Sequence, residues 1–76
     1  VTLARSSDSR VYVERFGEQL FTVFNDSPER RTVTIKLDRN IPKGGRELIT
    51  GQTVEWRDQQ ADLTLGGEDV AVIRIY

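Results

Sequence analysis

Apolar and polar residues alternate in short runs along most of this chain, and no run follows the period of a helix. The clearest run is Arg31–Leu37, in which Val33, Ile35 and Leu37 alternate with threonine and lysine. This alternation is typical of a strand with one buried face and one solvent-exposed face. The same pattern predicts further strands at Val11–Phe16, Leu20–Phe24, Glu47–Ile49, Thr53–Trp56, Ala61–Leu65 and Val70–Ile75.

The residues between these runs are those that turns require. Gly17-Glu18, Thr50-Gly51 and Gly66-Gly67 predict tight turns, because glycine adopts positive φ angles without strain. Asn25-Asp26-Ser27-Pro28 predicts a turn in which side chains bond their own backbone. The remaining connections are a loop at Asp38–Gly45, which contains Asn40, Pro42 and Gly44, and a polar tip at Arg57–Gln60.

About seven short strands at this spacing predict an all-β fold, a small antiparallel β-sandwich in which two sheets bury their apolar faces against each other. The sandwich is expected to occupy residues 10–76. Residues 1–9 contain the polar run Ser6–Ser9 and are expected to form a linker or a segment that leads into the domain.

The last predicted strand is apolar on both faces. Val70 and Val72 point one way, while Ala71, Ile73 and Ile75 point the other way. In so thin a domain, this pattern indicates that the outer face of the strand is covered by something else. A bulge that shifts the alternation midway would produce the same sequence. Both interpretations are open at this stage.

The composition lacks the residues that usually stabilise a small fold through disulfides or metal ions. A domain of 76 residues hides only about 60% of the surface that its unfolded chain exposes. The chain has no cysteine and no histidine, so disulfides, thiolate metal sites and imidazole chemistry are all excluded. Small folds without such support often gain stability from a partner surface. The lack of cysteine leaves the compartment undetermined.

The charge pattern narrows the range of partners. Eleven basic and twelve acidic residues are spread along the chain and give a net charge of −1. Without a basic block, nucleic acid is not an expected partner. No apolar stretch approaches the roughly 20 residues that cross a bilayer, and no signal-peptide pattern is present. The first residue is Val1 and not Met, which fits a fragment or a processed chain.

Carboxylates are the only catalytic groups that the composition leaves. Glycoside hydrolysis needs two of them, ~5–9 Å apart across a cleft. The glutamates at outward strand positions or in turns are expected to be solvated surface charges: Glu14, Glu29, Glu47, Glu55 and Glu68. Asp58, Asp62 and Glu68-Asp69 lack the close acidic spacing of a calcium loop. No catalytic residue, metal site or cofactor is therefore expected.

The aromatic residues favour packing over ligand binding. Trp56, Tyr12 and Tyr76 are residue types that stack on sugars, but they lie on distant predicted strands and form no visible platform. Trp56 is expected to pack at an edge of the core or at an interface. Asn25-Asp26-Ser27 also matches the N-glycosylation sequon, although its stronger interpretation is a turn.

Several segments together resemble the C-terminal β-sandwich of TIM-barrel glycoside hydrolases, as found in the alpha-amylase superfamily and related clans. The segments are Val11–Gly17, Leu20–Ser27, Arg31–Asp38, Glu47–Val54 and Asp62–Ile75. The most specific of them is the Thr-Gly-x-x-Val hairpin, which places Gly51 at a turn between two short strands. The resemblance implies a domain that packs against a catalytic barrel. It also implies that the catalytic carboxylates lie in that barrel, and it slightly favours an extracellular or secreted protein.

The leading hypothesis is therefore a non-catalytic accessory domain that stabilises the catalytic domain of a parent glycoside hydrolase. Its candidate docking residues are Tyr12, Val70, Val72 and Tyr76. One alternative is a carbohydrate-binding module that stacks sugars on Trp56. Another is a free-standing immunoglobulin-like interaction domain, although the Cys–Trp–Cys framework of true immunoglobulin domains is missing.

Overall fold

The computed structural model describes residues 4–17, 19–38 and 42–76. Glu18 and residues 39–41, which belong to two of the predicted connections, lie outside this description, as do residues 1–3. The elements are β1 (Ala4–Ser6), β2 (Val11–Arg15), β3 (Leu20–Asn25), β4 (Arg31–Leu37), β5 (Gly45–Glu47), β6 (Thr53–Val54), β7 (Gln60–Leu65) and β8 (Val70–Ile75). Over these ranges the structure contains no helix that is long and apolar enough to span a membrane.

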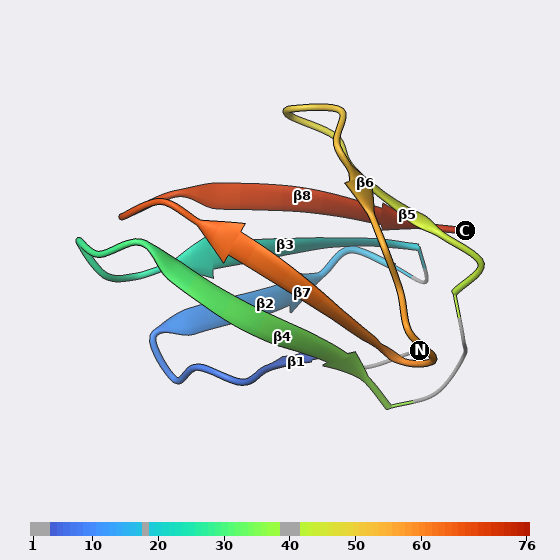
Figure 1. The fold of residues 1–76 in the computed structure, drawn as a ribbon, viewed down its shortest axis with the longest axis horizontal. Helices are drawn as coiled ribbons and strands as arrows, with labels where there is room; N and C mark the ends of the chain where they lie inside the picture. Colours follow the sequence, from blue (N-terminus) through green and yellow to red (C-terminus); the bar gives the residue numbers. More distant parts are fainter. Residues whose placement is uncertain (1–3, 18, 39–41) are drawn as a thin grey trace.

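The strands form two antiparallel sheets that face each other as the layers of a sandwich (Figure 1). One sheet has the strand order β1-β4-β7, and the other has the order β2-β3-β8-β5-β6. The predicted all-β antiparallel sandwich is thus confirmed, with eight strands in the described part of the chain instead of about seven.

The core lies between the two sheets and is made by alternate residues of the longer strands. Phe21 and Leu37 are fully buried, and they come from opposite sheets. Full burial of a side chain of this size contributes about 1.5–3 kcal/mol. The buried apolar residues are Val11, Phe21, Val23, Val33, Ile35, Leu37, Val54, Ala61, Leu65, Ala71, Ile73 and Ile75.

The additional strand, β1, falls within the segment that was expected to be a linker or to lead into the domain. Ala4 pairs with Leu37 of β4, and Ser6 pairs with Ile35. The backbone N–H of Ser7 continues this pairing by donating to the Thr34 carbonyl over 2.9 Å. Three residues are too few to show an alternating pattern, so β1 depends on the exposed edge of β4 for its conformation.

The strand predicted at Glu47–Ile49 was wrong in its position. β5 covers Gly45–Glu47, and Leu48–Gly51 belongs to the turn that leads to β6. The Glu47 N–H donates to the Gln52 carbonyl over 2.8 Å, which closes the hairpin. Gly51 has a φ of 79°, as the predicted turn at Thr50-Gly51 requires. β5 begins with glycine and contains no β-branched residue, so the alternation pattern did not predict a strand at Gly45–Glu47.

β8 resolves the two interpretations of the last strand. It pairs with β3 in continuous register from Leu20↔Arg74 to Phe24↔Val70, with no residue left over. The bulge interpretation is therefore wrong. The strand alternates regularly, so one apolar face joins the core and the other faces away from it.

Candidate functional site

The outer face of the five-stranded sheet carries a row of apolar side chains across three strands. Tyr12 of β2 pairs with Phe24 of β3, and Phe24 pairs in turn with Val70 of β8. Directly opposite residues on one face have Cβ atoms about 4.5–5.5 Å apart, so the three side chains are neighbours. Their exposed fractions are 54%, 37% and 45%, although two of the three strands lie in the interior of the sheet.

Two further residues extend this row into a patch. Val72 lies two residues beyond Val70 on the same face of β8 and is half-buried. The Leu48 N–H donates to the Val72 carbonyl over 2.8 Å, which places Leu48 beside Val72. Leu48 is 46% exposed. We call these five residues the apolar patch: Tyr12, Phe24, Leu48, Val70 and Val72.

The structure brings together three of the four candidate docking residues. Tyr12, Val70 and Val72 belong to the apolar patch, whereas Tyr76 lies six residues beyond Val70, about 20 Å along the strand. The Arg74 guanidinium separates Tyr76 from the patch and lies 6.0 Å from the centre of its ring. Tyr76 is 55% exposed and marks a different end of the sheet.

Phe24 and Leu48 belong to the patch but were missed by the sequence analysis. Phe24 was recognisable in principle, because the turn at Gly17 fixes a hairpin in which Tyr12 and Phe24 face each other. Leu48 carried no such signal, because its position depends on the correct placement of β5. Contiguous apolar groups on the surface of a small domain commonly mark a contact with another molecule or domain.

Glu47 is the one candidate catalytic carboxylate that is buried, with 5% of its surface exposed. Its Oε1 accepts hydrogen bonds from the Thr50 N–H over 2.6 Å and from the Thr50 hydroxyl over 2.9 Å. Its Oε2 accepts one from the Val72 N–H over 2.8 Å. Burial raises the pKa of Glu47, but the hydrogen bonds from Thr50, Val72 and Ile49 outweigh it and hold the pKa below the ordinary value.

This arrangement corrects the expectation that Glu47 is a solvated surface charge. An ionised carboxylate with both oxygens occupied by donors is suited to hold the β5–β6 turn against β8. A general acid needs the opposite environment, one that raises its pKa. Glu14, Glu29, Glu55 and Glu68 are exposed, as expected.

The other acidic residues also serve the fold or face solvent. Asp8 forms an ion pair with Arg31 at 2.8 Å, and the Arg10 N–H together with Arg31 lowers the pKa of Asp8. The Asp62 carboxylate accepts a hydrogen bond from the Thr34 hydroxyl over 2.8 Å. Across the residues that the structure covers, no three acidic side chains are grouped in a way that could hold a metal ion.

Trp56 follows β6 and packs against the core. Its ring meets Phe21 edge to face, with centroids 6.3 Å apart and an interplanar angle of 72°. It also lies against Gly45 of β5, where a Cβ atom would come within 2.5 Å of Trp56 Nε1. The half-buried indole thus fills the space that a glycine leaves. This packing favours a role in the core over sugar stacking.

The predicted turn at residues 25–28 contains a buried polar network. Asn25 is fully buried, and its amide nitrogen donates to the Glu29 carbonyl over 2.7 Å and to the Gly66 carbonyl over 2.9 Å. The Ser27 hydroxyl donates to Asn25 Oδ1 over 2.8 Å and accepts from Arg31 Nε over 2.9 Å. The sequon is therefore a structural element, because the Asn25 amide is occupied and out of reach of a glycan in the folded chain.

Comparisons with protein families, with curated proteins and with solved structures find no match for this chain.

Proposed function

We propose that this chain is a non-catalytic β-sandwich domain of a glycoside hydrolase, which packs against the catalytic barrel and stabilises it. The observation that carries the proposal is the apolar patch on the outer face of the five-stranded sheet. Burying Tyr12, Phe24 and Val70 against another domain would remove their exposed apolar surface from water at roughly 25 cal/mol per Å².

The position of the patch supports docking of a broad surface. It spans three neighbouring strands, and its centre lies on β3 and β8, away from the sheet edges. Towards the other end of the sheet the same face is polar, with Arg46 and Arg74 paired across β5 and β8. An apolar centre beside a polar rim is the usual anatomy of an interface between proteins or domains.

The chemistry of the described residues supports a role without catalysis. Glu47 is occupied by hydrogen bonds that keep it ionised, and Trp56 is committed to the core. The identification of the partner as a glycoside hydrolase barrel rests on the resemblance of five segments to the C-terminal sandwiches of these enzymes. In that arrangement the barrel carries the catalytic carboxylates.

The proposal is tested by comparing one substitution in two contexts, the chain alone and the full polypeptide encoded by its gene. In the chain alone, Val70→Ser is expected to change the free energy of unfolding by less than about 0.5 kcal/mol, because Val70 is already exposed. In the full polypeptide the same change is expected to weaken the contact between domains by about 2 kcal/mol. Thermal unfolding followed by calorimetry measures both.

Ile49→Ser is the matched control, since Ile49 is also apolar and exposed but lies in the turn after β5. It is expected to have the same small effect in both contexts. Equal effects of Val70→Ser in both contexts would contradict docking through the patch. Separately, the full polypeptide is expected to hydrolyse a glycosidic bond and the chain alone is not, and a full polypeptide without that activity would contradict the assignment of the partner.

A further inference from the structure

The free edge of β7 is a second surface, on the other sheet and away from the apolar patch. β7 is the last strand in the order β1-β4-β7, and among the described residues the only other strand it pairs with is β4. An edge strand presents unpaired N–H and C=O groups that can pair with another chain.

The hydrogen-bonding pattern identifies which residues of β7 face outward. The Thr34 carbonyl points towards β1, where it accepts from the Ser7 N–H. The backbone groups of the adjacent residues, Val33 and Ile35, therefore point towards β7. Val33 pairs with Leu63, and Ile35 pairs with Ala61. The residues next to these on β7, Asp62 and Thr64, direct their backbone groups away from β4. The Arg57–Gln60 pairing on the outward side of β7 agrees with this assignment.

The edge is open because the segment that precedes β7 runs beside it for only one pair of residues. Arg57 and Gln60 exchange hydrogen bonds of 2.8 and 3.0 Å, as in the first rung of a hairpin. Before Arg57, however, the chain comes from β6, which ends at Val54 and pairs with β5 in the opposite sheet. The connection between β6 and β7 thus crosses from one layer to the other at one end of the sandwich (Figure 1). In the described part of the chain, no pairing continues beside Asp62 and Thr64.

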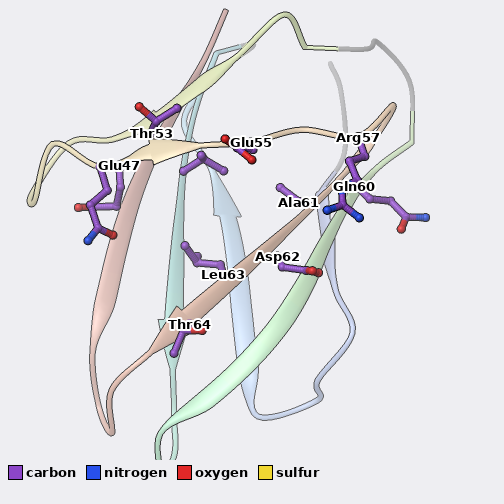
Figure 2. A pocket seen from close by; sticks show the side chains of 11 residues that line it. Glu47, Thr53, Glu55, Arg57, Gln60, Ala61, Asp62, Leu63 and Thr64 are labelled. Carbon is purple, nitrogen blue, oxygen red and sulfur yellow. The ribbon is translucent and has the colours of Figure 1, made fainter.

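A cleft of about 470 Å³ opens where the two strands diverge. Figure 2 shows that Leu63 and Asp62 leave β7 on opposite sides, as expected for neighbouring residues of a strand. Val54, Ala61 and Leu63 give the cleft an apolar part. Its exposed polar lining has an excess of negative charge: two carboxylates, Glu55 and Asp62, against one guanidinium, Arg57. Glu47 also borders the cleft, but it is buried and held by its own hydrogen bonds.

We infer that the β7 edge binds an extended peptide segment with alternating apolar and basic residues, which pairs as an additional strand. Its main chain bonds the outward groups of Asp62 and Thr64, its apolar side chains meet Leu63, and its basic side chains lie opposite Asp62 and near Glu55. Main-chain pairing supplies affinity and the alternating side chains supply specificity, as in other cases of strand addition. The negative lining selects basic over acidic peptides.

The inference is tested with a short synthetic peptide in which valine and lysine alternate, added to the isotope-labelled chain. Nuclear magnetic resonance is expected to show perturbed amide signals at Asp62 and Thr64, and hydrogen exchange at these amides is expected to slow. Methylating alternate main-chain nitrogens of the peptide removes its donors but keeps its side chains. This change is expected to weaken binding about tenfold, and replacing lysine by glutamate is expected to abolish it.

Two variants of the chain locate the site. Thr64→Pro removes the outward N–H at an edge position where proline is tolerated, so the variant is expected to fold, as dispersed resonances would show, and to lose peptide binding. Val70→Ser changes the other sheet and is expected to bind as the unchanged chain does.

Several outcomes would overturn the inference. They are no perturbation at peptide concentrations up to about 1 mM, equal binding of the methylated or acidic peptide, or perturbations at a different strand edge. Self-association of the chain through β7, seen as concentration-dependent sedimentation that Thr64→Pro abolishes, would assign this edge to a second copy instead. None of these outcomes bears on docking through the apolar patch.

Discussion

At the scale of single residues, the buried oxygens of Glu47 and Asn25 are held in place by the groups that donate hydrogen bonds to them. Glu47 is surrounded by N–H groups from a turn on its own hairpin and from Val72, which lies 25 residues away. Sequence analysis places a glutamate on the surface by default. Its burial depends on a long-range pairing of β5 with β8, and no local pattern in the sequence reports that pairing.

The lowered pKa of Glu47 predicts how stability depends on pH. Above its ordinary value of 4.5 the carboxylate is ionised in both states, and its hydrogen bonds stabilise the fold fully. As the pH falls below 4.5, the unfolded chain binds a proton before the folded chain does, so stability is lost until the folded pKa is passed. Glu47→Gln is expected to flatten this loss and to lower the stability at neutral pH by about 2 kcal/mol.

Urea unfolding at a series of pH values measures both effects. Glu55→Gln is the control, because Glu55 is exposed, and it is expected to shift the neutral-pH stability by less than about 0.5 kcal/mol. A Glu47→Gln variant with unchanged stability and an unchanged pH profile would show that the hydrogen bonds to Glu47 contribute nothing.

Asn25 provides a second prediction at this scale. Asn25→Ala removes an amide that joins the end of β3 to the carbonyls of Glu29 and Gly66, and it leaves the Ser27 hydroxyl without one acceptor. Because these groups are buried, the cost is expected to be about 3 kcal/mol in urea unfolding. Thr32→Ala, which removes an exposed hydroxyl contact of 2.9 Å, is expected to cost far less. Similar costs for the two variants would contradict the network.

At the scale of elements, the longer strands were predictable because each satisfies the alternation within itself. Arg31–Leu37 was predicted with its observed bounds, and Val70–Ile75 likewise. β1 and β5 have three residues each, too few to show a period, and they take their conformation from the strand beside them. The strand predicted at Thr53–Trp56 is present, but only Thr53–Val54 of it pairs, as β6. The place of Leu48 was also beyond the local pattern, because it depends on where β5 lies, whereas the pairing of Tyr12 with Phe24 could have been derived from the Gly17 turn.

The turn between β7 and β8 gives a prediction for two adjacent glycines. A Cβ atom on Gly67 would overlap the backbone carbonyl of Pro28, whereas one on Gly66 would meet the exposed Asp69 side chain at 3.2 Å. Gly67→Ala is therefore expected to destabilise the fold by about 2 kcal/mol, because the backbone must shift. Gly66→Ala is expected to have a small effect, because a side chain can move away. Thermal unfolding distinguishes them, and equal shifts would contradict the close approach.

At the scale of the whole molecule, the two sheets present different surfaces to the surroundings. The five-stranded sheet carries the apolar patch on its outer face, and the three-stranded sheet ends in the open edge of β7. A strand at Val70–Ile75 that is apolar on both faces was visible in the sequence, and in the structure Val70 of its outer face is exposed and Val72 is half-buried. The open edge was not visible, because it arises from the crossing between β6 and β7 and not from any residue type.

The proposal that another domain covers the apolar patch is tested by hydroxyl-radical footprinting of side chains, in the chain alone and in the full polypeptide encoded by its gene. If another domain covers the patch, modification of Tyr12 and Phe24 falls severalfold in the full polypeptide relative to the chain alone. Phe16, which is 60% exposed beyond the end of β2, is the internal reference and is expected to react equally in both. Equal modification of Tyr12 and Phe24 in the two forms would contradict docking through the apolar patch.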